Sequence, residues 1–245
     1  MLNEQTIGIL NSMKLFGMAQ SLPQRLADPK QAELSHAEFA ALLAQDEKMH
    51  RDNRRLARLL KNAKLKQQAA VEDIDYRHPR GLVRQAMMEL ANGAWMAAGR
   101  NVLITGPTGV GKSYIACALG NLAARAGHPV LYVRAPRLFE SLHQARGDGS
   151  HLKTLTRMGK VQVLIIDDFL ITPLAVAERK DFLEIIEDRY GAAATVITSQ
   201  CPLKDWHEGI GDPTLADAIC DRLMHNAYKF ELRLLGESMR KPAKG

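Results

Sequence analysis

The feature that most constrains the fold is the glycine-rich stretch GPTGVGKS, positions 106–113, which directly follows the apolar run NVLIT. It matches the pattern G-x-x-x-x-G-K-[S/T] at every position. Such a loop joins a strand to a helix, because its backbone N–H groups and the positive end of the helix together surround a phosphate chain. We therefore expect Lys112 to reach the β- and γ-phosphates of a nucleotide and the Ser113 hydroxyl to bind Mg²⁺. The predicted loop comprises Gly106, Pro107, Thr108, Gly109, Val110, Gly111, Lys112 and Ser113.

Beyond this loop, short apolar runs alternate with segments of helix-forming residues. The apolar runs predict strands at 101–106, 129–135, 161–167 and 194–200. One intervening segment, KSYIACALGNLAARAG, reads as a helix that Gly127 ends. Strands that alternate with helices form a parallel sheet covered by helices on both faces. The predicted fold class is therefore α/β, with a P-loop core.

The first 71 residues contain no convincing strand and are predicted to be helical. Ser35 and Glu38 fit a capping box, and no proline or glycine interrupts the sequence from there to about Val71. Pro79 and Gly81 then indicate a linker. The predicted organisation is a small all-helical domain at 1–71, a linker and helix at 72–99, and a nucleotide-binding domain at 100–245.

Two adjacent aspartates, Asp167 and Asp168, follow the apolar run VQVLII. Burying carboxylates at a strand end is costly unless a cation or hydrogen-bond donors meet them. Beside a nucleotide, the first acid is expected to bind Mg²⁺ together with Ser113, as in a Walker B motif. Asp168 would then orient or polarise the attacking water. A turn or helix-capping aspartate is the alternative for Asp168.

A strongly basic segment precedes the core. Eight Lys or Arg and one acid lie between Lys48 and Lys66, so this segment's net charge of +7 exceeds the +6 of the whole chain. On a helix most of these cations fall within an arc of about 120°, opposite a leucine-rich side. We predict contact with the phosphates of double-stranded DNA, largely independent of sequence. A solvated face, or one docked on acidic patches of another subunit, is the alternative. The predicted DNA-binding residues are Arg51, Arg54, Arg55, Arg58, Lys61 and Lys64.

Composition argues against several classes of protein. No apolar run approaches the roughly 18 residues of a membrane-spanning helix, and the N-terminus lacks the regions of a secretory signal. Cys117, Cys201 and Cys220 are isolated, with no spacing typical of a zinc site. Isolated cysteines are typical of reduced thiols in the cytoplasm. We therefore expect a cytoplasmic protein without zinc.

Several longer strings resemble the IstB family. These are GPTGVGKSYIACALG, LIIDDF, ITSQCPLKDWHE, GDPTLADAICDRLMHNAYKFEL and GESMRK, together with the N-terminal RDNRRLARLLKNAKL. Members of that family are AAA+ ATPases that assist insertion-sequence transposases and are related to the helicase loader DnaC and the initiator DnaA. The resemblance covers nearly the whole chain. It implies a Mg²⁺-dependent ATPase with an AAA+ core.

The resemblance also implies roles for individual residues. Gln200 matches the polar sensor of the γ-phosphate, and Thr198 and Ser199 lie close enough to share that role. Arg222 matches the arginine finger that completes the site of a neighbouring subunit. A salt bridge from Arg222 to Asp217 or Asp221 is the alternative.

Two departures from the family pattern concern the turn after Asp168 and the C-terminal segment. Leu170 follows the aromatic of DDF where the family usually has glycine, which leaves the local turn open. The spacing before Gly236 is slightly longer than usual, and Arg240 is either a second sensor of the nucleotide or a solvated arginine. Only about 15 residues follow Phe230, so a large helical lid is not expected.

These observations predict an ATP-dependent, DNA-binding regulator of transposition in the bacterial cytoplasm, associated with the nucleoid. It would assemble as an ATP-bridged homo-oligomer on target DNA, recruit or stimulate a cognate transposase, and disassemble on hydrolysis. A DnaC-like loader that grips a replicative helicase is the nearest alternative. A small-molecule P-loop kinase is more distant, since neither a lid nor an acceptor-substrate pocket is evident.

Overall fold

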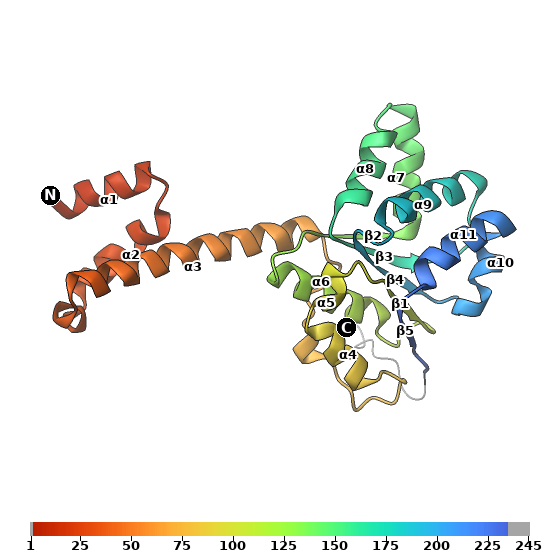
Figure 1. The fold of residues 1–245 in the computed structure, drawn as a ribbon, viewed down its shortest axis with the longest axis horizontal. Helices are drawn as coiled ribbons and strands as arrows, with labels where there is room; N and C mark the ends of the chain where they lie inside the picture. Colours follow the sequence, from red (N-terminus) through yellow and green to blue (C-terminus); the bar gives the residue numbers. More distant parts are fainter. Residues whose placement is uncertain (1, 235–245) are drawn as a thin grey trace, which may run out of the picture. The chain divides into compact units, whose positions relative to one another are not determined.

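The computed structural model describes residues 2–234, which divide between Arg58 and Leu59 into two compact units (Figure 1). The predicted division at residues 71 and 99 into functional domains stays a prediction. The α-helices are α1 (Leu2–Ser12), α2 (Phe16–Ala27), α3 (His36–Ala63), α4 (Arg84–Ala91), α5 (Ala94–Ala97), α6 (Lys112–Arg125), α7 (Ala135–Gly147), α8 (His151–Lys160), α9 (Val176–Arg189), α10 (Trp206–Ile210) and α11 (Pro213–Met224). Short 3₁₀ helices lie at η1 (Pro29–Glu33), η2 (Val71–Asp73) and η3 (Leu203–Asp205).

The N-terminal unit is helical, as predicted, and α2 packs closely on α3. Gly17 permits the close approach, because a Cβ there would lie 2.7 Å from the Cα of Glu47. The buried Glu47 carboxylate accepts hydrogen bonds from the backbone N–H of Gly17 (2.6 Å) and Met18 (3.2 Å). It thereby satisfies donors at the first turn of α2, which lacks a side-chain cap. The predicted capping box is confirmed, with the Ser35 N–H donating to Glu38 (2.8 Å) and the Glu38 N–H to Ser35 Oγ (3.3 Å).

Helix α3 ends at Ala63, earlier than the expected end near Val71. Lys64 has φ +53°, a left-handed conformation that stops the helix although the residue types would allow it to continue. The reason is tertiary packing. Ala63 is fully buried, and Leu65 lies against Gly120 of α6, where an added Cβ would meet Leu65 Cδ2 at 2.8 Å.

The second unit is built on a five-stranded parallel sheet with strand order β2-β3-β4-β1-β5 (Figure 1). The strands are β1 (Val102–Thr105), β2 (Val130–Arg134), β3 (Val163–Phe169), β4 (Ala194–Ser199) and β5 (Tyr228–Glu231). Because β4 lies between β1 and β3, the end of β4 stands between the glycine-rich loop after β1 and the aspartates of β3. This order brings the predicted site residues together at the carboxyl edge of the sheet.

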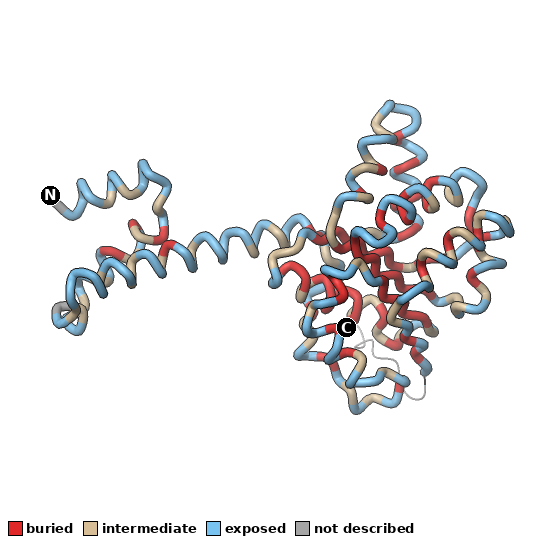
Figure 2. Tube along the Cα trace, in the orientation of Figure 1, coloured by how far each residue is buried: buried red, intermediate tan, exposed pale blue. Residues whose placement is uncertain are grey.

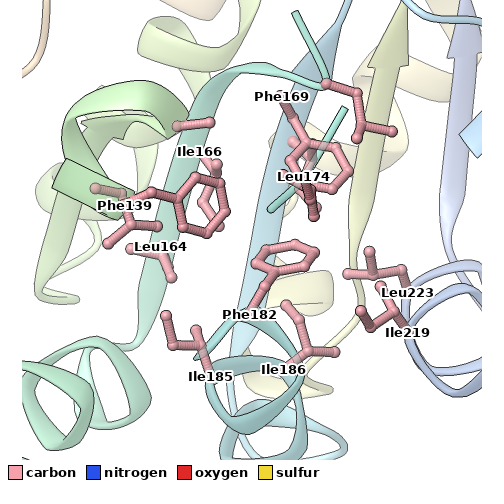
Figure 3. Close-up of a cluster of buried hydrophobic side chains, with 14 of the residues drawn as sticks. Phe139, Leu164, Ile166, Phe169, Leu174, Phe182, Ile185, Ile186, Ile219 and Leu223 are labelled. Atoms are coloured by element: carbon pink, nitrogen blue, oxygen red, sulfur yellow. The ribbon is translucent and has the colours of Figure 1, made fainter. Parts of the chain in front are cut away.

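Both faces of the sheet are covered, as predicted. On one face Leu164 and Ile166 of β3 join a buried cluster with Phe182 and Ile185 of α9 (Figure 3). The intervening Ile165 points to the other face, where a Cβ on Gly120 of α6 would meet it at 2.7 Å. Buried residues therefore concentrate along the strands and the helix sides that face them (Figure 2).

Strand β5 and helix α8 are among the elements that the sequence analysis, with its four predicted strands, did not identify. Strand β5 reads YKFE, in which only Phe230 is buried, so it lacks the continuous apolar run of the inner strands. Helix α8 lies between the predicted second and third strands and presents a narrow apolar side, with Leu155 and Met158 buried. Arg240 and the spacing before Gly236 lie outside the described residues.

Candidate functional site

The glycine-rich loop follows β1 and ends at Gly111, the N-cap of α6, in a left-handed conformation (φ +88°). Gly106 is also required sterically, because at φ +142° an added Cβ would lie 2.3 Å from the carbonyl oxygen of Leu232. The buried Lys112 ammonium donates to the carbonyl oxygens of Gly106 (2.6 Å) and Pro107 (2.9 Å). The loop is thus curled around its own lysine at the positive end of α6, an arrangement suited to an anion.

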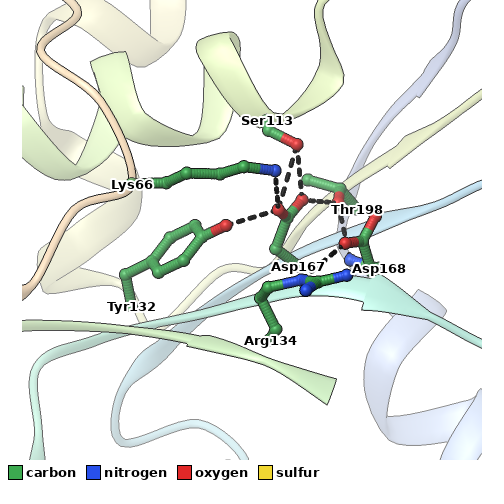
Figure 4. A network of polar contacts seen from close by, with 7 residues as sticks. All are labelled: Lys66, Ser113, Tyr132, Arg134, Asp167, Asp168 and Thr198. Carbon is green, nitrogen blue, oxygen red and sulfur yellow. Dashed lines mark hydrogen bonds and ion pairs between the residues drawn. The ribbon is translucent and has the colours of Figure 1, made fainter. Parts of the chain in front are cut away.

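Asp167 is fully buried at the end of β3 and is surrounded by donors (Figure 4). Ser113 Oγ lies 2.8 Å and 3.0 Å from its two carboxylate oxygens. The hydroxyls of Tyr132 and Thr198 also donate to it, and the Lys66 ammonium lies 3.4 Å away. Burial alone raises the pKa of this carboxyl, but these donors together hold the pKa below its ordinary value. The carboxylate is therefore ionised and accessible to Ser113, as the motif predicts.

Both aspartates reach the same site because β3 bulges at this point. Ile166 pairs with Ile197 and Phe169 with Ser199, so the two aspartates stand opposite the single residue Thr198. In a regular strand, neighbouring side chains point to opposite faces. Here Asp168 takes φ +62° and its N–H donates to Thr198 Oγ1 (3.2 Å), while the hydroxyl of Thr198 donates to Asp167.

The outer aspartate has a cation of its own. Arg134 Nε at the end of β2 donates to Asp168 Oδ2 (2.9 Å), and this half-buried carboxylate faces the site (Figure 4). Gln200, just after β4, accepts a hydrogen bond from Thr108 of the loop (2.9 Å). The structure therefore brings together Lys112, Ser113, Asp167, Asp168 and Gln200. Ser199 instead donates to the carbonyl of Phe169 (2.6 Å).

The turn after the aspartates keeps the glycine-like conformation that the sequence left open. Leu170 has φ +54°, a region that leucine rarely adopts, and only 9% of its surface is exposed. Its side chain packs into the apolar cluster and against Gly209 of α10, where an added Cβ would meet it at 3.2 Å. The turn is thus held by side-chain packing.

Arg222 does not join this group. It lies in the last turn of α11, and its carbonyl accepts a hydrogen bond from Asn101. Asn101 precedes β1, so Arg222 lies near the amino-terminal end of this strand, whereas the glycine-rich loop follows its carboxyl end. Its guanidinium pairs with Glu187 of α9 through two contacts of 2.7 and 2.6 Å and donates to the carbonyl of Ala218 (2.8 Å). The partner is therefore Glu187, which the sequence analysis did not consider, and neither Asp217 nor Asp221.

The predicted basic residues are all exposed on or just after α3, whereas Leu56, Leu59 and Ala63 are partly or fully buried. The N-terminal end of this basic face already makes contacts within the N-terminal unit. Arg51 pairs with Glu47 (2.6 Å), and the Arg54 guanidinium lies 5.5 Å from the centre of the Phe16 ring. The predicted cationic face exists, and its N-terminal end also contributes to packing.

Sequence reasoning missed Lys66, Tyr132 and Arg134. Tyr132 and Arg134 are two residues apart near the end of β2, so their side chains lie on the same face, and Arg134 is in register with Asp167. Two polar residues at this spacing near a strand end were a usable signal in the sequence. Lys66 reaches Asp167 from a segment 101 residues away in sequence, and nothing in its local sequence indicates this contact. It comes from the loop that follows α3.

Comparison with known proteins decides the family. The sequence matches the family described as IstB-like ATP binding protein over residues 8–245. The chain belongs to this family. An insertion sequence ATP-binding protein of Sinorhizobium fredii is 49% identical over 98% of this chain and 98% of that one. The insertion sequence IS21 ATP-binding protein of Pseudomonas aeruginosa is 32% identical over 95% of this chain and 87% of that one.

Solved structures confirm the P-loop AAA+ fold of this IstB-like chain. DnaI matches with a TM-score of 0.58 and 24% identity, covering 71% of this chain and 91% of that one. The DnaC helicase loader matches with a TM-score of 0.55 and 19% identity, covering 67% and 96%. DnaA bound to AMPPCP and single-stranded DNA also gives 0.55, at 18% identity, covering 70% and 51%. In residues 2–234, no helix has the length and apolar character needed to cross a membrane.

Proposed function

We propose that this protein is an ATP-dependent, DNA-binding regulator of transposition that hydrolyses ATP. The observation that carries the proposal is the contact between Ser113 of the glycine-rich loop and Asp167 of β3, in a chain whose relatives are insertion-sequence ATP-binding proteins along nearly their whole length. A loop of this sequence, joined to an ionised carboxylate, is the arrangement that phosphoryl-transfer sites use.

The donor set fits Mg²⁺ bound together with ATP. Mg²⁺ prefers oxygen ligands and is usually held by one or two protein groups plus substrate phosphates and waters. Asp167 and Ser113 supply a carboxylate and a hydroxyl, and no cluster of three His, Cys, Asp or Glu competes for a metal in residues 2–234. These two residues would hold the ion, which when bound neutralises charge on the phosphates.

Lys112 would exchange its two bonds to loop carbonyls for phosphate oxygens, which keeps a buried ammonium paired throughout. Asp168 would accept hydrogen bonds from the attacking water and orient it, because its carboxylate lies one residue beyond Asp167 at the mouth of the site. Gln200 would report on the terminal phosphate to the loop through Thr108. We expect Asp168→Asn to bind ATP but to hydrolyse it far more slowly, and an unchanged turnover number would exclude this role.

Assembly would place Arg222 beside the nucleotide of a neighbouring subunit, where a guanidinium can neutralise charge that develops during transfer. Within one subunit, Arg222 lies near the amino-terminal ends of the strands, whereas the loop lies at their carboxyl ends. Arg222 is therefore suited to act only on the nucleotide of a neighbouring subunit. The Glu187 carboxylate would hold it in an extended orientation until the neighbour arrives. ATP then favours the oligomer because it bonds better to that state.

Duplex DNA is the proposed partner of the exposed cations on α3. Neutralising phosphates along a duplex releases counterions, so binding should weaken steeply with salt. Arg58, Lys61 and Lys64 are the best candidates, because Arg51 and Arg54 already serve packing. We expect Lys61→Gln with Lys64→Gln to lower the slope of log affinity against log salt by about two, with Lys153→Gln on α8 as the matched control. An unchanged slope would exclude contact between this face and DNA.

A helicase loader remains the second candidate, because DnaI and DnaC share the core fold. Those two structures cover only 71% and 67% of this chain, whereas the insertion-sequence relative covers 98%. The transposition proposal therefore accounts for more of the sequence. The two candidates are separated by adding transposase or replicative helicase to the ATP-bound protein on DNA and measuring which one co-sediments.

A further inference from the structure

Arg80 lies behind the glycine-rich loop and is almost completely buried, with 2% of its surface exposed. Its Nη1 donates to the carbonyl oxygen of Val110 (2.9 Å), and its Nη2 to that of Asp75 (3.0 Å). Its own carbonyl accepts from the N–H of Arg233 (2.9 Å), which follows β5. The guanidinium is therefore fixed to the loop on one side and to the segment before α4 on the other.

No carboxylate in residues 2–234 forms an ion pair with the Arg80 guanidinium. Its Nε, also buried, has no hydrogen-bond partner in the described part of the chain. The Asp75 carboxylate acts on it only through a longer-range Coulomb interaction and is itself bonded to the backbone N–H and the side chain of Arg77. Burial lowers the pKa of Arg80, yet a guanidinium stays charged in proteins. A buried cation held only by two carbonyl groups is costly.

The position of this charge adds a second cost. Gly111 is the N-cap of the 14-residue helix α6, and an added Cβ there would lie 2.5 Å from Arg80 Nη1. The guanidinium therefore sits at the positive end of the helix dipole, where an anion is favoured and a cation is not. A polyphosphate in the loop would offset both costs, because its negative charge attracts the guanidinium.

We infer that Arg80 belongs to the phosphate site, as a buried positioning residue that strengthens the binding of nucleoside di- and triphosphates relative to monophosphates. The inference rests on the proposed nucleotide binding at this loop. Arg80 acts from behind: its charge attracts the phosphate chain, and its bond to Val110 orients the peptide that precedes Gly111. A side chain at position 111 would displace this guanidinium, so the glycine serves Arg80 as well as the turn.

The test compares two variants. Arg80→Lys keeps the positive charge, whereas Arg80→Gln removes the charge but keeps a hydrogen-bond donor. Affinities for ADP and AMP are measured by calorimetry, after circular dichroism has shown that each variant is folded. Arg77→Gln is the matched control, because Arg77 lies three residues away and its side chain is 94% exposed. We expect Arg80→Gln to weaken ADP about tenfold, the scale of one charge–charge interaction across about 10 Å at an effective dielectric constant of about 20, and AMP at most about twofold. Arg80→Lys should bind ADP within about threefold of wild type.

Equal losses for ADP and AMP in Arg80→Gln, or equal ADP affinity in the Gln and Lys variants, would overturn the inference in favour of a purely structural arginine. If Arg80→Gln does not fold, Arg80→Lys decides alone. The ratio of its ADP and AMP affinities should equal that of wild type, and a collapsed ratio with the charge retained would contradict the inference. A wild-type protein that binds neither nucleotide would instead refute the proposed function.

Discussion

Replacing Asp167 by Asn tests whether this carboxylate carries both local stability and nucleotide binding. Asparagine fills the same volume but offers one acceptor oxygen and no charge. In the folded protein Oδ1 accepts from Thr198 and Ser113, and Oδ2 accepts from Tyr132, Lys66 and Ser113. The amide of the variant must turn its NH₂ group toward one of these two sets of donors.

The expected loss of stability follows from these contacts. A hydrogen bond to a charged group contributes about 1.5–3 kcal/mol, and the partly exposed Lys66 ammonium adds less than about 1 kcal/mol. Hydroxyl donors can rotate and accept from the new NH₂, so the net loss corresponds to about one charged hydrogen bond. We expect the free energy of unfolding without nucleotide to fall by about 2 kcal/mol.

Ligand should widen this difference. Mg²⁺-ATP at a hundred times its dissociation constant stabilises the wild type by about 2.7 kcal/mol. A tenfold loss of affinity in Asp167→Asn removes about 1.4 kcal/mol of that gain. Urea unfolding followed by circular dichroism, with ATP and either Mg²⁺ or EDTA, measures both effects, and the exposed Asp221→Asn on α11 is the control. If Asp167→Asn matches wild type without ligand and keeps the whole Mg²⁺-dependent gain, the reasoning about this carboxylate is wrong.

Three further predictions concern other contacts. Lys66→Met should lower the Mg²⁺ concentration needed for ATP binding, because it removes a cation 3.4 Å from Asp167. The control Lys153→Met should leave this concentration unchanged. If the Mg²⁺ concentration at half-saturation is also unchanged in Lys66→Met, Lys66 does not compete with Mg²⁺ for Asp167. Burial raises the pKa of Glu47, but the N–H donors and Arg51 together hold this pKa below its ordinary value. The Glu47 carboxylate therefore stabilises the fold above the unfolded pKa of about 4.3, and this stabilisation is lost as the pH falls through the folded pKa. Glu47→Gln should therefore cost about 1–2 kcal/mol at pH 7 and progressively less below about pH 4, measured by thermal unfolding; a difference independent of pH would contradict this. Leu170→Ala should cost about 3 kcal/mol through lost packing, whereas Leu170→Gly should be no worse despite the usual penalty for glycine, because it relieves the strain of φ +54°. Urea unfolding that ranks Gly about 1 kcal/mol below Ala would show that the turn is unstrained.

Much of the core was predictable because its signals are local and strong. The loop motif fixes a strand before it and a helix after it, and β1, β2, β3 and β4 are continuous apolar runs, as buried parallel strands require. β5 was missed because an edge strand with one buried side chain has no such run. The end of α3 was missed because packing of Leu65 on α6, rather than residue propensity, stops the helix.

The candidate site divides in the same way. Ser113, Asp167 and Asp168 were predictable because the motif and the strand end each mark them. The partners of the aspartates were not, since Lys66 and Arg134 reach them through tertiary structure. Two adjacent acids in the sequence do not indicate that the strand bulges opposite Thr198. This bulge allows both carboxylates to face one site. Arg80 gave no signal at all, because only the fold reveals that it is buried behind the loop.

The most direct test of the central claim is sedimentation velocity of the protein with duplex DNA and Mg²⁺ in the presence of ATP or ADP. We expect large DNA-bound oligomers with ATP and their loss with ADP. We also expect that Arg222→Ala binds ATP normally but does not assemble, while Arg179→Ala on α9 behaves as wild type. Oligomers that form equally with ATP and ADP, or that form normally from Arg222→Ala, would contradict ATP-bridged assembly.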